Sequence, residues 1–193
     1  TDSSGNVILP CIQKIIFRDT LLPTITCPND TTLYLDVQCF ADTTIASTGM
    51  ATAMDNCSDS VTQFSYTDSI IPGACAANDT ILRTWTATDS CGNVSLPCIQ
   101  KIILLDTVRP MIMCPYETIT IECGDEMPPL HTSLDSFLAD GGTVFDNCCL
   151  DSAGFSGTET MVMAGSTINI TRVYKISDCC GNMDSCIILI TIP

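Results

Sequence analysis

The chain has 193 residues, enough for one large domain or for two domains of about 90 residues that each bury a core. Its 22 acidic and 7 basic residues give a net charge of −15, which argues against nucleic acid and anionic membrane surfaces as partners. The apolar stretches have strand length, and a membrane helix needs about 18 or more consecutive apolar residues, so we expect no membrane insertion.

Cysteine is the most unusual part of the composition. The sequence holds 14 cysteines and no Cys-x-x-Cys pair. Structural zinc sites favour thiolates two to four residues apart, so the spacing does not favour zinc. Abundant cysteine without such pairs predicts a disulfide framework and an extracellular or cell-surface location.

Residues 1–20 read like the end of a domain. Their sequence, TDSSGNVILPCIQKIIFRDT, returns at residues 88–107 with differences at only four positions, and a more divergent copy occupies residues 177–193. The first two copies start 87 residues apart and the last two 89. We therefore predict two full repeats, 20–106 and 107–193, after a terminal strand (1–19) of a preceding repeat or a donated strand. Without an initiator Met or a basic and apolar leader, the chain is expected to be a mature segment or a piece of a longer one.

Within each repeat, the patterns are those of β-strands. Apolar and polar residues alternate in 33–37 and again in 119–123, and ILRTWTATD (81–89) corresponds to INITRVYKISD (168–178). This correspondence places Trp85 and Tyr174 in register, and we expect Trp85 in the core. Residues 134–138 predict one short helical turn. We expect an all-β chain of tandem, disulfide-stapled immunoglobulin-like β-sandwich repeats, each with about seven short strands.

The repeats resemble a known family. The pattern D-x-x-x-P-x-I-x-C-P, then D-N-C, then W-x-A-T-D-x-C-G-N and a closing C-I-x-x-I, is similar to the hyalin-type repeat. This immunoglobulin-like module recurs in tandem in surface proteins, including long adhesins of Bacteroidota. The matching residues are Asp19, Pro23, Cys27, Pro28, Asp89, Gly92, Asn93 and Cys98 in the first repeat, and Asp106, Pro110, Cys114, Pro115, Asp178, Gly181, Asn182 and Cys186 in the second.

The resemblance implies a non-catalytic role in extracellular adhesion or architecture. It also implies one disulfide per repeat that joins the first strand to the last, Cys27–Cys98 and Cys114–Cys186. The chain has more cysteines than the usual single bridge of the family, so the resemblance does not extend to the other pairs.

Other pairings follow from the repeats themselves. The D-N-C and D-x-C-G-N motifs each occur once per repeat, and two further cysteines are then left in the first repeat. These observations predict three more bridges: Cys57–Cys91, Cys148–Cys180 and Cys39–Cys75. Cys123, Cys149 and Cys179 remain in the second repeat, where two of them can pair.

Cys11 has no expected partner within the chain. An odd thiol in a secreted protein suggests pairing outside it, either in a longer array or with a neighbouring subunit. The surrounding segment is an apolar strand that could dock on another copy, because sheet edges accept strands. This candidate polymerisation strand consists of Cys11, Ile12, Ile15, Ile16 and Phe17.

Few residues suggest catalysis. The only histidine, His131, lies in a PPLHTS segment that the first repeat lacks, and we expect it on an exposed loop. The sequence contains no G-x-S-x-G motif, phosphate-binding glycine loop or histidine-rich metal motif. We therefore expect the protein not to be an enzyme, and to require no cofactor.

Carboxylates near the cysteine motifs are candidate calcium ligands. Calcium takes six to eight oxygen ligands, commonly from Asp, Asn and backbone carbonyls. Asp and Asn also cap tight turns without a metal, which is the alternative interpretation. Asp19 and Asp106 lie at the repeat junctions, where an ion could stiffen the linker, and Asn56, Asn93, Asn147 and Asn182 accompany the motifs. The candidate ligands are Asp55, Asp59, Asp89, Asp146, Asp151 and Asp178.

Glycans are a second candidate addition. Five N-x-S/T sequons predict covalent N-glycans wherever the secreting cell can attach them. They are at Asn29, Asn56, Asn78, Asn93 and Asn169.

Two functions are consistent with this sequence. The leading hypothesis is a structural subunit or segment of an extracellular filament, assembled head to tail with itself or with upstream repeats, and completed by the N-terminal piece. The alternative is a cell-surface adhesin segment that binds glycan or protein ligands. Only eleven aromatic residues are present, and the clearest of them lie in strand patterns, so a glycan platform is hard to locate.

Overall fold

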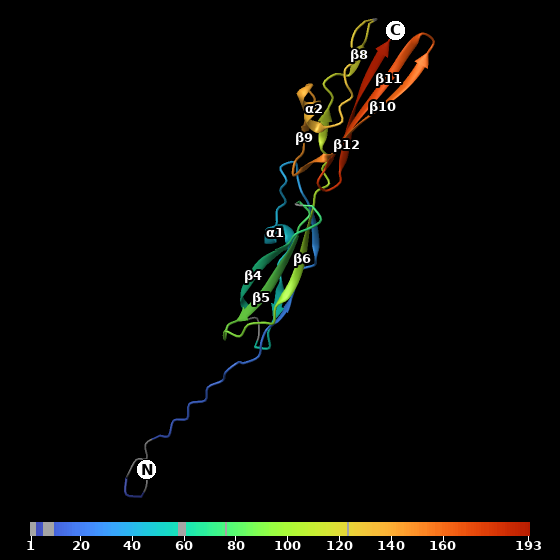
Figure 1. The fold of residues 1–193 in the computed structure, drawn as a ribbon. Coiled ribbons are helices and arrows are strands. Elements are labelled where there is room, and N and C mark those ends of the chain that lie inside the picture. Colours follow the sequence, from blue (N-terminus) through green and yellow to red (C-terminus); the bar gives the residue numbers. More distant parts are fainter. Residues whose placement is uncertain (1–2, 6–9, 58–60, 76, 123) are drawn as a thin grey trace.

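The computed structural model describes residues 3–5, 10–57, 61–75, 77–122 and 124–193. Figure 1 shows an extended N-terminal segment followed by two strand-built units stacked end to end, with the two termini at opposite ends of the molecule. Among the described residues, no helix has the length and apolar character needed to cross a membrane.

The first unit is built on a four-stranded sheet in the order β2-β6-β5-β4, with a separate two-stranded sheet, β1-β3. Strand β2 runs parallel to β6, while the other neighbours are antiparallel. The elements are β1 (Thr24–Thr26), β2 (Thr31–Tyr34), α1 (Ile45–Thr48), β3 (Thr52–Met54), β4 (Val61–Ile71), β5 (Thr80–Asp89) and β6 (Cys98–Leu105).

The second unit repeats this arrangement element by element. Its sheets are β10-β11-β12-β8 and β7-β9, and β8 runs parallel to β12. The elements are β7 (Met111–Met113), β8 (Thr118–Thr120), α2 (Leu134–Ala139), β9 (Thr143–Phe145), β10 (Leu150–Ala164), β11 (Thr167–Asp178) and β12 (Met183–Ile192). The all-β, tandem sandwich architecture is thus confirmed, although each unit has six strands in its described residues where about seven were expected.

The central strand of each large sheet explains its core. Buried and partly buried residues alternate along all of β5, as a strand with one face in the core requires. Trp85 on β5 is 1% exposed, which confirms it as a core residue, and its counterpart Tyr174 on β11 is 0% exposed. Around Tyr174, the rings of Phe137 and Phe155 lie with centroids 5.1 and 5.9 Å away.

One disulfide crosses each sandwich. Cys27, just after β1, is joined to Cys98 at the start of β6, and Cys114, just after β7, is joined to Cys186 on β12. These are the two bridges that the family resemblance implies. Each therefore ties the small sheet to the large one.

A buried arginine recurs at the same place in both units. Arg83 on β5 is 2% exposed and binds both carboxylate oxygens of Asp68 on β4, at 2.8 Å each. It also donates to the backbone oxygen of Thr43 at 2.8 Å. In the second unit, Arg172 pairs with Glu159 at 2.7 Å and donates to a backbone carbonyl at 3.1 Å. Each arginine thus fixes the backbone that precedes the short helix of its unit, α1 or α2.

The short helix predicted near residue 134 is confirmed as α2, but the prediction for His131 is wrong. His131 is 7% exposed; its ring approaches Asp140 Oδ2 at 3.1 Å, and its backbone N–H donates to the Tyr174 hydroxyl. Ser133 caps α2 through its side chain, which accepts from the backbone N–H of Ser136. The PPLHTS segment therefore passes over the core and does not form an exposed loop.

Candidate cation and disulfide sites at the repeat junction

Two disulfides join the first repeat to the second. Cys39 is bonded to Cys148, and Cys75 to Cys180. The predicted pairs Cys39–Cys75 and Cys148–Cys180 are therefore wrong. The physical reason is that the D-N-C and D-x-C-G-N loops of the second repeat lie at the end that faces the first repeat.

Apolar packing accompanies the two bridges. Leu35, Cys75 and Ala77 form a buried cluster at the end of the first repeat that faces the second. Cys148 and Cys180, from the second repeat, pack against this cluster. The repeats are thus joined by covalent bonds and by a small shared core.

A third bridge lies within the second repeat. Cys149 is bonded to Cys179, and the backbone N–H of Cys179 donates to the carbonyl of Cys149 at 2.9 Å. This settles the pairing that the sequence left open for these two cysteines. Cys123, the third of that set, lies outside the described residues.

The predicted bridge between Cys57 and Cys91 is also wrong. Cys91 is an exposed thiol, and the Cys57 thiol forms a hydrogen bond with Asp19. That hydrogen bond, with burial and the nearby carboxylates as smaller causes, raises the pKa of Cys57. These two cysteines are the counterparts of Cys148 and Cys180, which bond across a junction and not to each other.

Three carboxylates meet at the junction beside the disulfides. Asp106, Asp146 and Asp178 each bring one carboxylate oxygen within 4.8 Å of the other two. Asp106 and Asp178 are 5% and 2% exposed. Within the described residues, no Lys, Arg or His forms an ion pair with any of them. Negative charge is therefore concentrated in a mostly buried place.

Backbone and amide groups hold these carboxylates in position. Oδ2 of Asp146 accepts from the N–H groups of Cys148 and Cys149, at 2.9 and 2.8 Å. Oδ1 of Asp178 accepts from the N–H of Asn182, whose side-chain amide also donates to the backbone oxygen of Asp106. Asp146 and Asp178 therefore cap tight turns, as the interpretation without a metal predicted. These hydrogen bonds occupy only some of the carboxylate oxygens.

Three buried oxygens of this group accept no hydrogen bond from any described residue. They are Oδ2 of Asp106, Oδ1 of Asp146 and Oδ1 of Asn147. The Asn147 amide donates to Asp106 Oδ1 at 3.3 Å and to the backbone oxygen of Asp36, in the first repeat, at 2.9 Å. Asn147 thereby connects the carboxylates to both sides of the junction.

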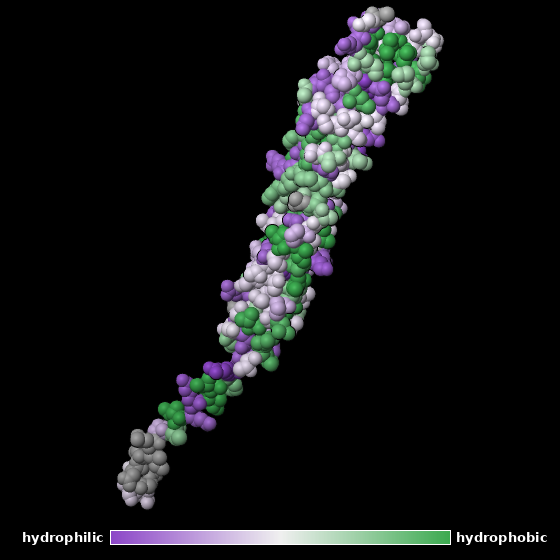
Figure 2. Space-filling model, viewed as in Figure 1, coloured by the Kyte–Doolittle hydropathy of each residue, from purple (hydrophilic) through white to green (hydrophobic). Residues whose placement is uncertain are grey.

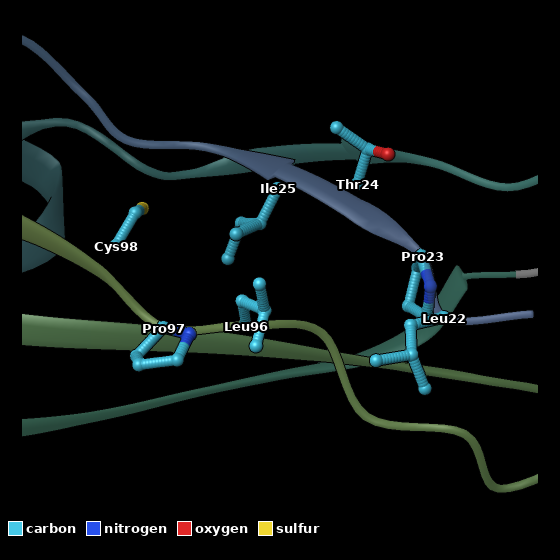
Figure 3. A pocket seen from close by; sticks show the side chains of 7 residues that line it. All are labelled: Leu22, Pro23, Thr24, Ile25, Leu96, Pro97 and Cys98. Carbon is cyan, nitrogen blue, oxygen red and sulfur yellow. The ribbon is translucent and has the colours of Figure 1, made fainter.

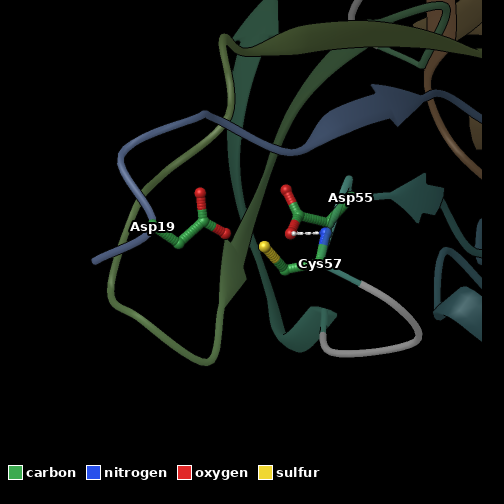
Figure 4. A group of neighbouring side chains, drawn as sticks. All are labelled: Asp19, Asp55 and Cys57. Carbon is green, nitrogen blue, oxygen red and sulfur yellow. Dashed lines mark hydrogen bonds between the residues drawn. The ribbon is translucent and has the colours of Figure 1, made fainter. Parts of the chain in front are cut away.

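A related group lies at the N-terminal end of the first repeat. Ligand atoms of Asp19, Asp55 and Cys57 lie within 4.8 Å of one another, and Figure 4 shows their side chains converging. The Cys57 N–H donates to Oδ2 of Asp55 at 3.2 Å, and Oδ1 of Asp55 is buried with no hydrogen-bond partner among the described residues. A thiol stands in this group in place of the third carboxylate.

Asp89 corresponds to Asp178 but does not belong to that group. Burial acts to raise the pKa of its carboxyl, but hydrogen bonds from Asn93, Cys91 and Gly92 together lower it. The Asn93 amide donates both to Asp89 Oδ2, at 2.8 Å, and to the backbone oxygen of Asp19, at 3.4 Å. Asp89 thus anchors the loop that faces the N-terminal segment.

The structure gathers the predicted calcium ligands only in part. Asp146 and Asp178 come together with Asp106, which the sequence placed at the junction, while Asp55 comes together with Asp19. Asp151 belongs to neither described group, and its Oδ1 accepts from the N–H of Ala153. Asp59 lies outside the described residues.

The asparagines of the five sequons differ in their surroundings. Asn29, Asn56 and Asn169 are exposed. Asn78 and Asn93 are half-buried, and their side chains hydrogen-bond to Asp106 and Asp89. Three of the five sequon asparagines are therefore accessible at the surface.

The N-terminal segment leaves its apolar side chains in solvent. Ile12 and Phe17 are 88% and 94% exposed, Ile15 and Ile16 are exposed as well, and Cys11 is an exposed thiol. Residues 10–23 contain no strand, and Figure 2 shows their apolar side chains on a narrow projection from the body of the molecule.

An open hollow of about 290 Å³ lies between the start of β1 and the loop before β6 (Figure 3). Sugar-binding sites commonly stack the ligand on an aromatic ring, and no aromatic side chain lines this hollow. It therefore gives no support to a glycan site. Its lining residues are Leu22, Pro23, Thr24, Ile25, Leu96, Pro97 and Cys98.

No family model matches the chain, and no curated protein matches it. Among solved structures, human CDH23 EC21-23 is similar at a TM-score of 0.37 and 12% identity, over 90% of this chain and 70% of the other. Human mucin-like protocadherin EC1-2 has a TM-score of 0.33 and 8% identity, over 88% and 98%. Human protocadherin-24 EC1-2 has a TM-score of 0.29 and 11% identity, over 90% and 100%.

Proposed function

We propose that this chain is a non-catalytic structural element of an extracellular fibre or stalk, and that it works as a stiff spacer. The observation that carries the proposal is the pair of disulfides between the repeats. A junction closed by one peptide linker usually allows relative motion of domains, whereas two further covalent links restrict it. Such a function requires no cofactor, and a bound ion or glycans would only stiffen or protect the spacer.

Small-angle X-ray scattering under non-reducing conditions tests this proposal. We expect the wild-type chain to scatter as one narrow family of elongated shapes. A variant without the junction bridges (C39S, C75S, C148S and C180S) should show a broad range of bend angles. The matched control, C149S with C179S, lacks a bridge inside the second repeat and should keep the narrow distribution. Equal flexibility in all three proteins would contradict the proposal.

Head-to-tail assembly is the second part of the proposal. The exposed apolar segment around Ile12 and Phe17 resembles β6, which is paired on both sides in its own repeat. Such a segment is stabilised when it adds to a sheet of another unit. Analytical ultracentrifugation should show concentration-dependent oligomers, which are lost when Ile12, Ile16 and Phe17 are replaced by Ser.

The adhesin alternative makes a different prediction. A monomer that stays monodisperse at high concentration and binds members of a glycan array would favour it. The structural proposal expects no saturable glycan binding, and the described hollow between β1 and β6 offers a sugar no aromatic platform.

A further inference from the structure

We infer that the repeat junction binds one divalent cation, with Ca²⁺ as the best fit, through Asp106, Asp146, Asn147 and Asp178. This goes beyond the spacer function, which needs no ion. The inference rests on clustered carboxylates together with buried oxygens that lack a hydrogen-bond partner among the described residues.

Without a cation, burial of this carboxylate cluster costs free energy. Asp106 is 5% exposed, and its Oδ2 is shielded from solvent and accepts no hydrogen bond from the described residues. A buried charge or polar oxygen left without a partner costs free energy, and like charges at close range add to that cost. Since Oδ1 of Asp146 and Oδ1 of Asn147 share this condition, one ion would satisfy three buried oxygens at once.

The chemistry of the oxygens points to a hard cation. The available ligands are carboxylates and an amide carbonyl, and no thiol or imidazole belongs to the described junction group. All three carboxylate oxygens lie within 4.8 Å of one another, close enough for one ion to bind each of them at a Ca–O distance of about 2.4 Å. Ca²⁺ accepts six to eight oxygens in irregular geometry, whereas Mg²⁺ demands near-octahedral geometry and keeps several waters, so a site of buried protein oxygens favours Ca²⁺.

The ligands come from both sides of the linker. Asp106 follows β6 of the first repeat, whereas Asp146 and Asn147 precede β10 and Asp178 ends β11 of the second. The Asn147 amide is already bound to Asp36 in the first repeat. The ion would therefore fix the chain at Asp106 to the two loops that carry the junction cysteines.

Calorimetric titration of the chelator-treated, oxidised full chain with CaCl₂ tests the inference. We expect one equivalent to bind, and binding to weaken by roughly tenfold or more in D106N and in D146N. The control is E126Q, which removes one exposed carboxylate from the same repeat and should bind like wild type. Absence of saturable binding, equal loss in E126Q, unchanged binding in D146N, or stronger binding of MgCl₂ would overturn the assignment.

A second measurement needs no variant and so does not depend on how the substitutions fold. NMR titration of the wild-type chain with CaCl₂ should move the amide signals of residues 106, 146–148 and 178–182 in a saturable manner. Saturable shifts confined to other regions, or no shifts, would overturn the proposal. Both experiments report on the ion alone, so their outcome is independent of whether the chain forms filaments.

Discussion

Cys75 and Cys180 are bonded across the repeat junction although 105 residues separate them in the chain. The second junction bridge, Cys39–Cys148, spans 109 residues. Because both bonds cross the same boundary, an unfolding first repeat stays attached to the second at Cys148 and Cys180 while the bridges are intact. Coupling between the repeats is thus built in covalently.

Calorimetry of unfolding should reveal this coupling. We expect the wild-type chain to unfold in one transition, and the variant lacking all four junction cysteines to unfold in two. In the chain-entropy model, a bridge that closes about 100 residues contributes roughly 4 to 5 kcal/mol, so the variant should also melt at lower temperature. The C149S/C179S control should retain the single transition, and two transitions in the wild type would contradict the prediction.

Removal of the buried guanidinium should destabilise the first repeat strongly. Replacing Arg83 by Met leaves the Asp68 carboxylate and the Thr43 carbonyl without their donor. Breaking a buried pair costs about 3 to 5 kcal/mol, and because Asp68 is 32% exposed we expect about 2 to 3 kcal/mol in urea unfolding. Lysine cannot bind both carboxylate oxygens side by side, so R83K should recover little of this loss.

A matched control for Arg83 is the exposed Lys101 on β6. K101M removes one positive charge without breaking a buried pair, and its free energy of unfolding should stay within about 0.5 kcal/mol of wild type. If K101M and R83M were equally destabilised, net charge and not the buried pair would be the cause.

The Cys57 thiol should react slowly with alkylating reagents. Its raised pKa leaves less thiolate at neutral pH, and the thiolate is the reacting form. Replacing Asp19 by Asn removes the main cause, so the pKa should fall and alkylation by iodoacetamide should become faster. Mass spectrometry of labelled peptides measures this rate, with Cys11 in the same sample as the reference. No change in the rate of Cys57 relative to Cys11 would contradict the prediction.

Acid should weaken the first repeat through Asp89. Its carboxyl has a lower pKa in the folded chain than the ordinary value of about 3.9, so its stabilising contribution is complete above that pH and is lost as the pH falls through the folded pKa. In N93A the pKa should rise toward the ordinary value, and the contribution should shrink at neutral pH. Thermal unfolding between pH 2 and 7 measures both effects, and identical pH profiles would contradict the prediction.

The sequence was sufficient for the architecture, because strand alternation and repetition are local signals. Trp85 could be placed in the core from its strand pattern, and Tyr174 could be placed in register with it. Arg83 and Arg172 were missed, since an arginine within a strand pattern reads as an outward position. Only the three-dimensional position of Asp68 shows that the guanidinium is paired inside the sandwich.

The disulfides show where sequence reasoning stops. The number of cysteines in each repeat allows Cys39 to pair with Cys75 or with Cys148. Counting cysteines therefore cannot distinguish a bridge within one repeat from a bridge between two repeats. The deciding fact is which end of the sandwich each loop occupies, and that depends on sheet topology. For the same reason the junction carboxylates were only partly identified, as Asp106 belongs to one repeat and Asp146 to the next.

The Cys27–Cys98 and Cys114–Cys186 bridges also define the route of tension along the molecule. When force is applied to the two ends of the chain, the Cys27–Cys98 bridge transmits it from the N-terminal segment directly to β6. The linker after β6 then transmits the force to Cys114, and the Cys114–Cys186 bridge transmits it to β12. The bridges span 71 and 72 residues, so at about 3.5 Å per extended residue each one withholds roughly 250 Å of contour length. A stretched chain would therefore lengthen by little more than its short linkers, and most of each sandwich would carry no tension.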